Sequence, residues 1–161
     1  MSNVIEMLVF DRTVADRDGA LAIGKKINEG KATPQELSQW LSTAQKGSYN
    51  ASDLNRIGQA MSYLAGLFRS YGYIIEVTGK ADWDVRGIPT LAQLDTYISD
   101  LKALRGIVAM LPTTPTAPDT MERMDYITAN AIEKILFDID DTLDRMRRGW
   151  FYSGEIYAGE V

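Results

Sequence analysis

The 161-residue sequence contains no histidine and no cysteine. These two absences exclude an imidazole general base, a thiolate nucleophile, a disulfide bond and a zinc site with nitrogen or sulfur ligands. Long apolar runs are also missing, and the opening MSNVIEMLVFDRT has the pattern of neither a signal peptide nor a transit peptide. We therefore expect no membrane-spanning helix and no cofactor, and any metal site would have to be built from carboxylates.

The sequence has fewer basic than acidic residues, 17 lysines and arginines against 22 aspartates and glutamates, which gives a net charge of −5. Residues 1–118 carry 12 of each sign, and residues 119–161 carry 10 acidic and 5 basic, so the whole acidic surplus lies in the last quarter. This balance argues against binding to nucleic-acid phosphates. Apolar residues at 45% and charged residues at 24% are typical of a folded domain, and the length suits a single one.

Helix start and stop signals recur along the chain. Capping residues or capping boxes begin at Thr13, Thr33, Asn50 and Thr90, and glycines suited to end a helix stand at positions 30, 47 and 72. These signals predict helices over residues 14–29, 34–46, 51–71 and 91–110, and the apolar spacing predicts a last helix over 126–148. The two clearest apolar seams are Leu54, Ile57, Met61, Leu64, Phe68, Tyr71 and Ile132, Ile135, Leu136, Ile139, Leu143, Met146.

Three other stretches do not have helical spacing. Residues 73–77 (YIIEV) are rich in β-formers and predict a short strand, and residues 4–10 together with the tail from Trp150 are also β-capable. Three of the five prolines lie in residues 112–118, which predicts an extended connector. The expected fold is mainly α: a bundle of four to five amphipathic helices with a short β element and extended β-capable termini. Its expected organisation is an N-terminal arm (1–12), a helical domain (13–148) and an aromatic C-terminal arm (149–161).

One motif suggests enzyme chemistry. Residues 135–143 (ILFDIDDTL) match the Asp-x-Asp-x-Thr nucleophile motif of haloacid-dehalogenase-type phosphatases, with Asp138, Asp140 and Thr142 at the key positions. That chemistry needs Asp138 at the end of a parallel strand, and a lysine and an acidic pair downstream, but only 18 residues follow Leu143 and none is lysine. The same residues also fit a helix with its apolar side chains on one face. Because a helix does not provide the backbone that this chemistry needs, we expect no enzyme activity. An Asp-dependent, metal-requiring phosphohydrolase is kept as the alternative.

The acidic residues Asp138, Asp141 and Asp144, with Glu133, recur at helical spacing and could hold a divalent cation, because a cation would relieve their mutual repulsion. The sequence lacks the glycine-containing loop of an EF-hand here. We therefore favour a solvated acidic helix face over a metal site.

The aromatic C-terminus is the stronger functional candidate. Five large apolar residues fall within eight positions: Trp150, Phe151, Tyr152, Ile156 and Tyr157. Two interpretations stay open. The tail folds back and completes the helical core, or it acts as an arm that pairs with a sheet edge or groove of a neighbouring subunit.

Several segments together resemble a module of tail and baseplate-region structural proteins from phages and prophages of Gram-positive bacteria. They are residues 10–16 (FDRTVAD), 47–58 (GSYNASDLNRIG), Trp83, Ile88-Pro89, 101–105 (LKALR), 129–136 (ANAIEKIL) and the closing 152–161 (YSGEIYAGEV). The resemblance covers nearly all of the chain and implies a noncatalytic virion component with no catalytic residues.

From this resemblance we expect a tail or baseplate protein that binds other tail proteins and forms a homo-oligomer in a symmetric assembly. It would be located in the virion, and in the host cytoplasm during assembly. A small cytoplasmic helical adaptor that works as a monomer is the other alternative.

Overall fold

A computed structural model describes residues 3–41, 46–84 and 86–154 of the chain. Within these ranges the protein is mainly α-helical and contains no β-strand. The helices are α1 (Asn3–Glu6), α2 (Val14–Asn28), α3 (Pro34–Leu41), α4 (Ala51–Ser70), α5 (Leu91–Arg105) and α6 (Tyr126–Gly154). No helix among the described residues is long and apolar enough to cross a membrane.

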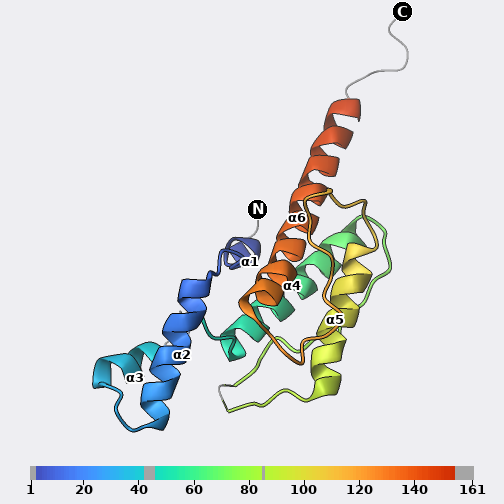
Figure 1. Ribbon diagram of the computed structural model, residues 1–161. Helices are drawn as coiled ribbons and strands as arrows, with labels where there is room; N and C mark the ends of the chain where they lie inside the picture. Colours follow the sequence, from blue (N-terminus) through green and yellow to red (C-terminus); the bar gives the residue numbers. More distant parts are fainter. Residues whose placement is uncertain (1–2, 42–45, 85, 155–161) are drawn as a thin grey trace, which may run out of the picture.

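The body of the molecule consists of α4, α5 and α6, which pack on one another, with α1 lying against α4 and α6 (Figure 1). The predicted seams form its core: Ile57, Leu64 and Phe68 of α4 and Ile132, Ile135, Leu136 and Ile139 of α6 are fully buried. The apolar spacing therefore predicted correctly which face of each long helix is buried.

The helix ends follow the predicted signals. Thr13, Asn50 and Thr90 each form a complete capping box, and Gly30 and Gly72 adopt positive φ angles of 66° and 88° just beyond α2 and α4. Only glycine adopts this backbone conformation at little cost, which explains why the helices end there. Helix α5 ends at Arg105 instead of near position 110.

The prediction of a strand at residues 73–77 is wrong: this segment has no regular secondary structure and belongs to a long connection between α4 and α5. Of the two isoleucines in this segment, Ile75 is buried in the core and Ile74 is fully exposed. No neighbouring strand exists among the described residues to pair with it, and an isolated extended segment is not a strand.

The prediction of a strand-like segment near the N-terminus is also wrong. Residues 3–6 form helix α1 instead of a strand-like arm, and Ile5 and Leu8 are buried in the core. At the other end, residues 150–154 continue α6. Helix α6 thus has 29 residues, a length of about 43 Å, and its last turns extend beyond the other helices (Figure 1).

Helices α2 and α3 form a hairpin that projects from the body at the opposite end from the C-terminal part of α6 (Figure 1). Ala20 is the one buried residue of α2, which is described throughout. The hairpin therefore stands largely outside the common core.

Candidate functional site

The hairpin of α2 and α3 carries exposed large apolar side chains, among them Leu21 and Trp40. Lys26 donates to Glu36 at 2.5 Å and joins the two helices, while the Thr33 N–H donates to the same carboxylate at 2.9 Å. These contacts lower the pKa of Glu36 to about 2, chiefly through Lys26. They fix the angle between the helices but bury little apolar surface.

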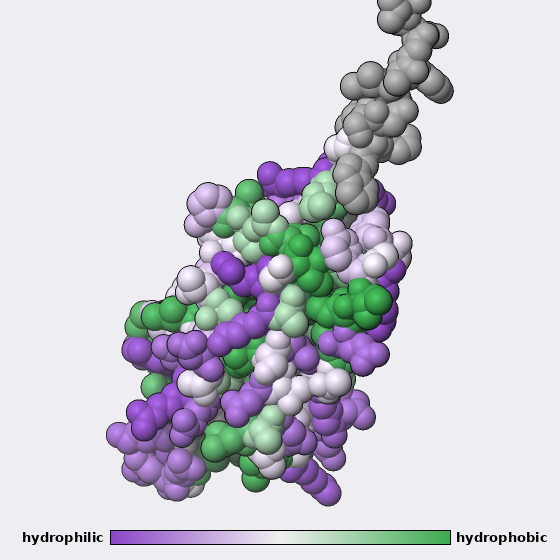
Figure 2. All heavy atoms as spheres, turned by 90° about the vertical axis from the view of Figure 1, so that its right-hand side faces the viewer, coloured by the Kyte–Doolittle hydropathy of each residue, from purple (hydrophilic) through white to green (hydrophobic). Residues whose placement is uncertain are grey.

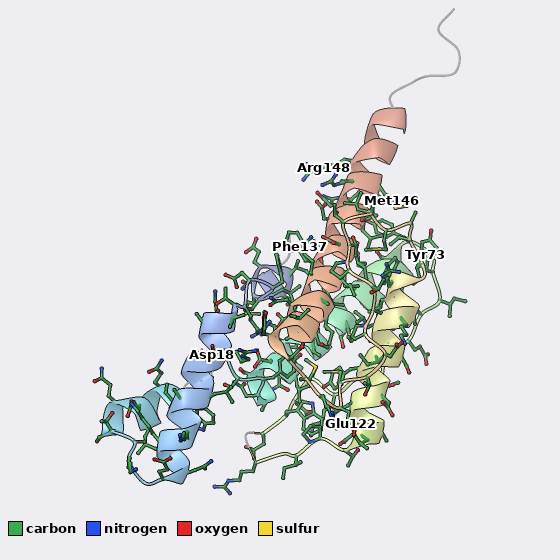
Figure 3. All side chains as sticks on the ribbon, in the orientation of Figure 1. Asp18, Tyr73, Glu122, Phe137, Met146 and Arg148 are labelled. Atoms are coloured by element: carbon green, nitrogen blue, oxygen red, sulfur yellow. The ribbon has the colours of Figure 1, made fainter. Side chains whose placement is uncertain are left out.

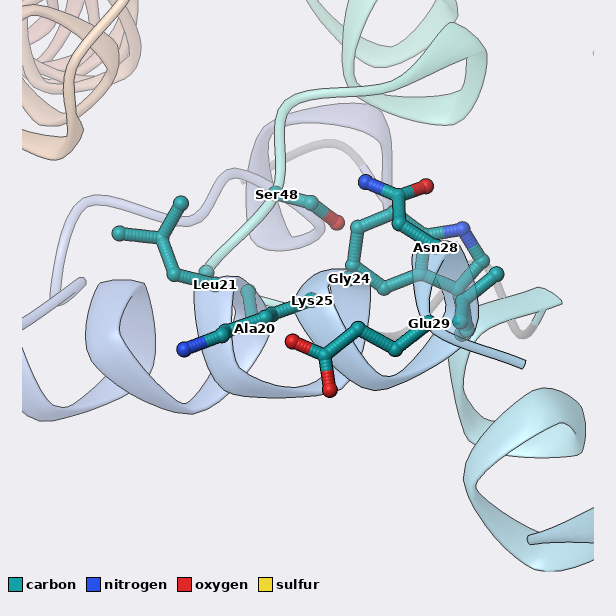
Figure 4. A pocket seen from close by; sticks show the side chains of 10 residues that line it. Ala20, Leu21, Gly24, Lys25, Asn28, Glu29 and Ser48 are labelled. Atoms are coloured by element: carbon teal, nitrogen blue, oxygen red, sulfur yellow. The ribbon is translucent and has the colours of Figure 1, made fainter. Parts of the chain in front are cut away.

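A groove with a volume of about 680 Å³ lies along this hairpin, between α2, the indole of Trp40 and the return segment at Gly47 and Ser48 (Figure 4). Gly24 lies directly beneath Trp40, where a Cβ atom would meet the indole at 3.2 Å. Gly47 lies against the Asp16 carbonyl, where a Cβ would come within 1.9 Å. Both glycines therefore permit the close approach that shapes the groove.

Apolar side chains around the groove stay exposed. Of the residues that line the groove, Leu21 is 64% exposed and Trp40 is 37% exposed. Lys25 lines the groove and makes no ion pair with any described residue, whereas the neighbouring Glu29 is neutralised by Lys31 at 2.9 Å. The groove therefore combines apolar side chains with the positive charge of Lys25, which no described carboxylate pairs with.

A buried charge network joins the hairpin to the body. Arg12 Nη2 donates to Asp53 at 3.0 Å and to Glu133 at 2.7 Å, and Arg56 Nε donates to Glu133 at 2.8 Å and its Nη2 to Asp53. The side chains of Arg12 and Glu133 are almost completely buried. Two positive and two negative groups balance one another, as buried charges must.

The backbone of the N-terminal segment is also bound to α6. The Val9 N–H donates to Glu133, and Asn130 exchanges two hydrogen bonds with the backbone of Arg12, at 3.1 Å and 2.9 Å. Residues 3–12 therefore pack onto their own chain instead of forming a free arm. Nothing in the sequence pattern indicated this network, because its members lie up to 121 positions apart.

Tyr49 lies beside this network, with Arg12 positioned over its ring at 5.7 Å. Its hydroxyl is buried and has no hydrogen-bond partner among the described atoms. Burial, followed by the nearby carboxylates of Glu133 and Asp53, raises the pKa of Tyr49 well above its usual value. Tyr49 is therefore neutral at any physiological pH.

The candidate phosphatase residues lie in the middle of α6, within a continuous helix. Asp138 is buried and accepts hydrogen bonds from Thr114, at 2.7 Å, and from Lys134. Asp140 is also buried, and the Thr142 hydroxyl is enclosed without a partner among the described atoms. Residues 135–143 thus do not have the strand-then-loop backbone that the phosphatase chemistry requires.

The prediction of a solvated acidic face holds only in part. Asp138 is not solvated, because the proline-containing connector covers it through Thr114. Asp141 pairs with Arg145 at 2.8 Å, and Asp144 pairs with Arg147 at 2.9 Å and with Arg148 at 2.6 Å. Basic residues one helical turn later compensate these carboxylates, and no group of three metal-ligating side chains occurs within the described ranges.

Asp140 makes stability depend on pH. Burial raises the pKa of Asp140, and a hydrogen bond from Tyr63 offsets this only in part. Because the unfolded carboxyl ionises at lower pH than the folded one, the contribution of Asp140 to the free energy of unfolding decreases as pH rises above about 4. We expect Asp140→Asn to be more stable than the original protein at pH 7, with the difference shrinking toward pH 3.5 in urea denaturation. The exposed Asp82→Asn is the control, and a constant difference at all pH values would contradict the assignment.

The predicted partner-binding residues fall at the end of the described chain. The backbone of Trp150, Phe151 and Tyr152 belongs to the last turns of α6. Binding of a neighbouring subunit through these residues stays a prediction. Ile156 and Tyr157 lie outside the described residues. Figure 3 shows Tyr73 and Met146 at the end of the body where α6 leaves it, and Asp18 of α2 well away from that end.

An apolar collar surrounds this point of departure. Tyr71, Tyr73, Leu143 and Met146 line a small recess there, and Figure 2 shows apolar surface below the projecting end of the chain. Among the α6 residues whose side chains are described, Met146 is the last that packs against the core. The described residues thus place this collar and the groove of the hairpin in separate parts of the molecule.

Comparison with known proteins gives no assignment: no family model, no curated protein and no solved structure matches this chain.

Proposed function

We propose that this chain is a structural component of a phage tail or baseplate, and that it acts by assembly with other protein chains. The observation that carries the proposal is the α2–α3 hairpin, which projects from the body with Leu21 and Trp40 uncovered around an open groove. A hairpin with so small a core of its own gains stability when its apolar side is covered by a partner.

The surroundings of the carboxylates support assembly over catalysis. A reacting carboxylate needs access to substrate, but Glu133 and Asp53 are enclosed by two arginines, and Asp138 is covered by the connector. The helical backbone at Asp138 argues in the same direction against the alternative phosphohydrolase. We therefore propose that the chain is not an enzyme and needs no cofactor.

The phage context of the proposal rests on the sequence resemblance of residues 47–58 and 152–161 to tail and baseplate-region proteins. Residues 47–58 include the capping box of α4 and the Asp53 and Arg56 side chains of the buried network. This segment therefore contributes both the start of α4 and two of the four charged side chains of the buried network. The proposed partners are other tail proteins and further copies of this chain, in the virion and, during assembly, in the host cytoplasm.

Two measurements test the proposal. Antibodies against this chain, followed by electron microscopy of purified particles, should label one fixed position on the tail. Light scattering of the purified protein, with and without residues 150–161, should show self-association that depends on the tail. A protein that stays monomeric in both forms and is absent from particles would instead indicate the monomeric adaptor.

A further inference from the structure

We infer that the groove of the α2–α3 hairpin binds the C-terminal segment from Trp150 onward of a second copy of this chain. This inference rests on the proposed role in assembly and specifies which surfaces meet. The contact would be head-to-tail, since the donor segment and the receiving groove are different surfaces of the same molecule.

The first argument is geometric. The buried network fixes the start of α2 beside Glu133 of α6, and α6 then runs 21 residues further to Gly154, a rise of about 32 Å. The α2–α3 hairpin, whose residues line the groove, projects at the opposite end of the molecule from the C-terminal part of α6 (Figure 1). Residues 155–161 can span about 25 Å when fully extended, which does not return them even to the level of Glu133. The segment therefore cannot fill the groove of its own molecule.

The second argument is chemical complementarity. Residues 149–161 (GWFYSGEIYAGEV) contain four aromatic residues, two glutamates and no basic residue. The groove offers the apolar surfaces of Leu21, Ile27 and Trp40 together with the ammonium group of Lys25. Aromatic side chains bury a large area at a small loss of conformational entropy. The glutamates of the segment are attracted to Lys25, and this attraction favours the segment over basic or neutral peptides.

The third argument concerns the end of α6. After Met146 the helix continues beyond the core, and Arg147, Arg148 and Gly149 are exposed. Trp150 follows Met146 at a spacing of four, so the apolar repeat of α6 continues in the sequence beyond Met146. We expect this end of the helix to contact a neighbouring molecule.

Head-to-tail contacts of this kind close into a ring if the rotation between copies permits it, and otherwise extend into a filament. Each copy then contributes one groove and one segment, so every contact in the assembly is the same. Weak single contacts become effective because several act together.

The first test changes the groove. Leu21→Glu places a charge in the groove at an exposed position, so it is not expected to disturb folding. The control is Ile127→Glu, which makes the same change at a site 60% exposed on the first turn of α6. Sedimentation velocity should show self-association weakened by about tenfold or more for Leu21→Glu and unchanged for Ile127→Glu. Equal behaviour of the two variants would overturn the inference.

The second test mixes two defective chains. The Leu21→Glu chain has a defective groove and an intact C-terminal segment, whereas the Trp150→Ala/Phe151→Ala chain has an intact groove and a defective segment. Only one contact can therefore form between them, and a mixture should give 1:1 pairs and nothing larger. A symmetric groove-to-groove contact would give no pairing in the mixture. Association that persists in both variants would overturn this inference while leaving the proposed assembly role intact.

The third test uses the absence of cysteine. A chain with Ser48→Cys in the groove, mixed with a chain carrying Ile156→Cys, should form an intermolecular disulfide under mild oxidation (Figure 4). The control replaces Ser48→Cys by Thr116→Cys, at an exposed site of the connector. Cross-linking that is no faster for position 48 than for position 116 would contradict docking in the groove.

Discussion

Glu133→Ala is expected to reduce the free energy of unfolding by about 3–5 kcal/mol, because it leaves two buried arginines with a single carboxylate. Glu133 is fully buried and accepts hydrogen bonds from the Val9 N–H, from Arg12 at 2.7 Å and from Arg56 at 2.8 Å. Burial alone would lower the pKa of Arg56, but Glu133 and Asp53 raise it further than burial lowers it. After the substitution, Arg12 and Arg56 have only the Asp53 carboxylate to share.

Urea denaturation followed by circular dichroism measures this effect. Glu133→Gln is the matched variant: it keeps the shape and some of the hydrogen bonds, so its cost should be intermediate. Asp119→Asn removes an exposed partner of Lys102 and should leave the midpoint unchanged, as is usual for surface ion pairs. If Glu133→Ala cost no more than Asp119→Asn, the four charges could not be buried together as described.

Trp83→Ala should cost a similar amount, about 3–5 kcal/mol, although Trp83 belongs to a connection without regular structure. The side chain is 8% exposed, and its Nε1 donates to the Tyr97 hydroxyl at 2.7 Å. Asn55 of α4 accepts from the Trp83 N–H at 2.5 Å and donates to its carbonyl at 2.9 Å. Trp83 thus fastens the long connection to α4 and α5.

The matched control is Trp40→Ala, which removes the same side chain from an exposed position in the groove. Its cost in stability should be markedly smaller, and its main effect should fall on self-association. Hydrogen exchange offers a local measurement, since the Thr78 and Gly79 N–H groups donate to the buried Asp100 at 2.8 Å and 2.7 Å. Trp83→Ala should speed exchange at these two amides, and unchanged exchange would contradict the anchoring role.

The comparison of sequence and structure is most instructive for α6. Its apolar spacing predicted both the helix and the buried stripe, because a repeat of three and four residues is local information. The same spacing did not reveal that Asp138 is covered by Thr114, since this contact joins positions 24 residues apart through a connector that has no regular structure. The prediction of a solvated face failed there for that reason.

The strand predicted at residues 73–77 failed for a related reason. β-Forming residues favour strands only when a neighbouring strand supplies hydrogen bonds, and the described structure places helices α4 and α5 around this segment instead. The sequence signals placed helices over residues 14–29 and 34–46, but they did not indicate that this part of the chain stands outside the core or that Trp40 and Gly47 complete a groove.

The sequence by itself determined where the long helices begin, which faces they bury and, through its missing histidine and cysteine, which chemistries are excluded. Capping, periodicity and composition are properties of neighbouring residues, and they can be read directly from the chain. Tertiary structure alone decided that Arg12, Asp53, Arg56 and Glu133 neutralise one another, and that the groove and the end of α6 lie at opposite ends of the molecule. These facts depend on contacts between distant segments, which are fixed only when the helices pack.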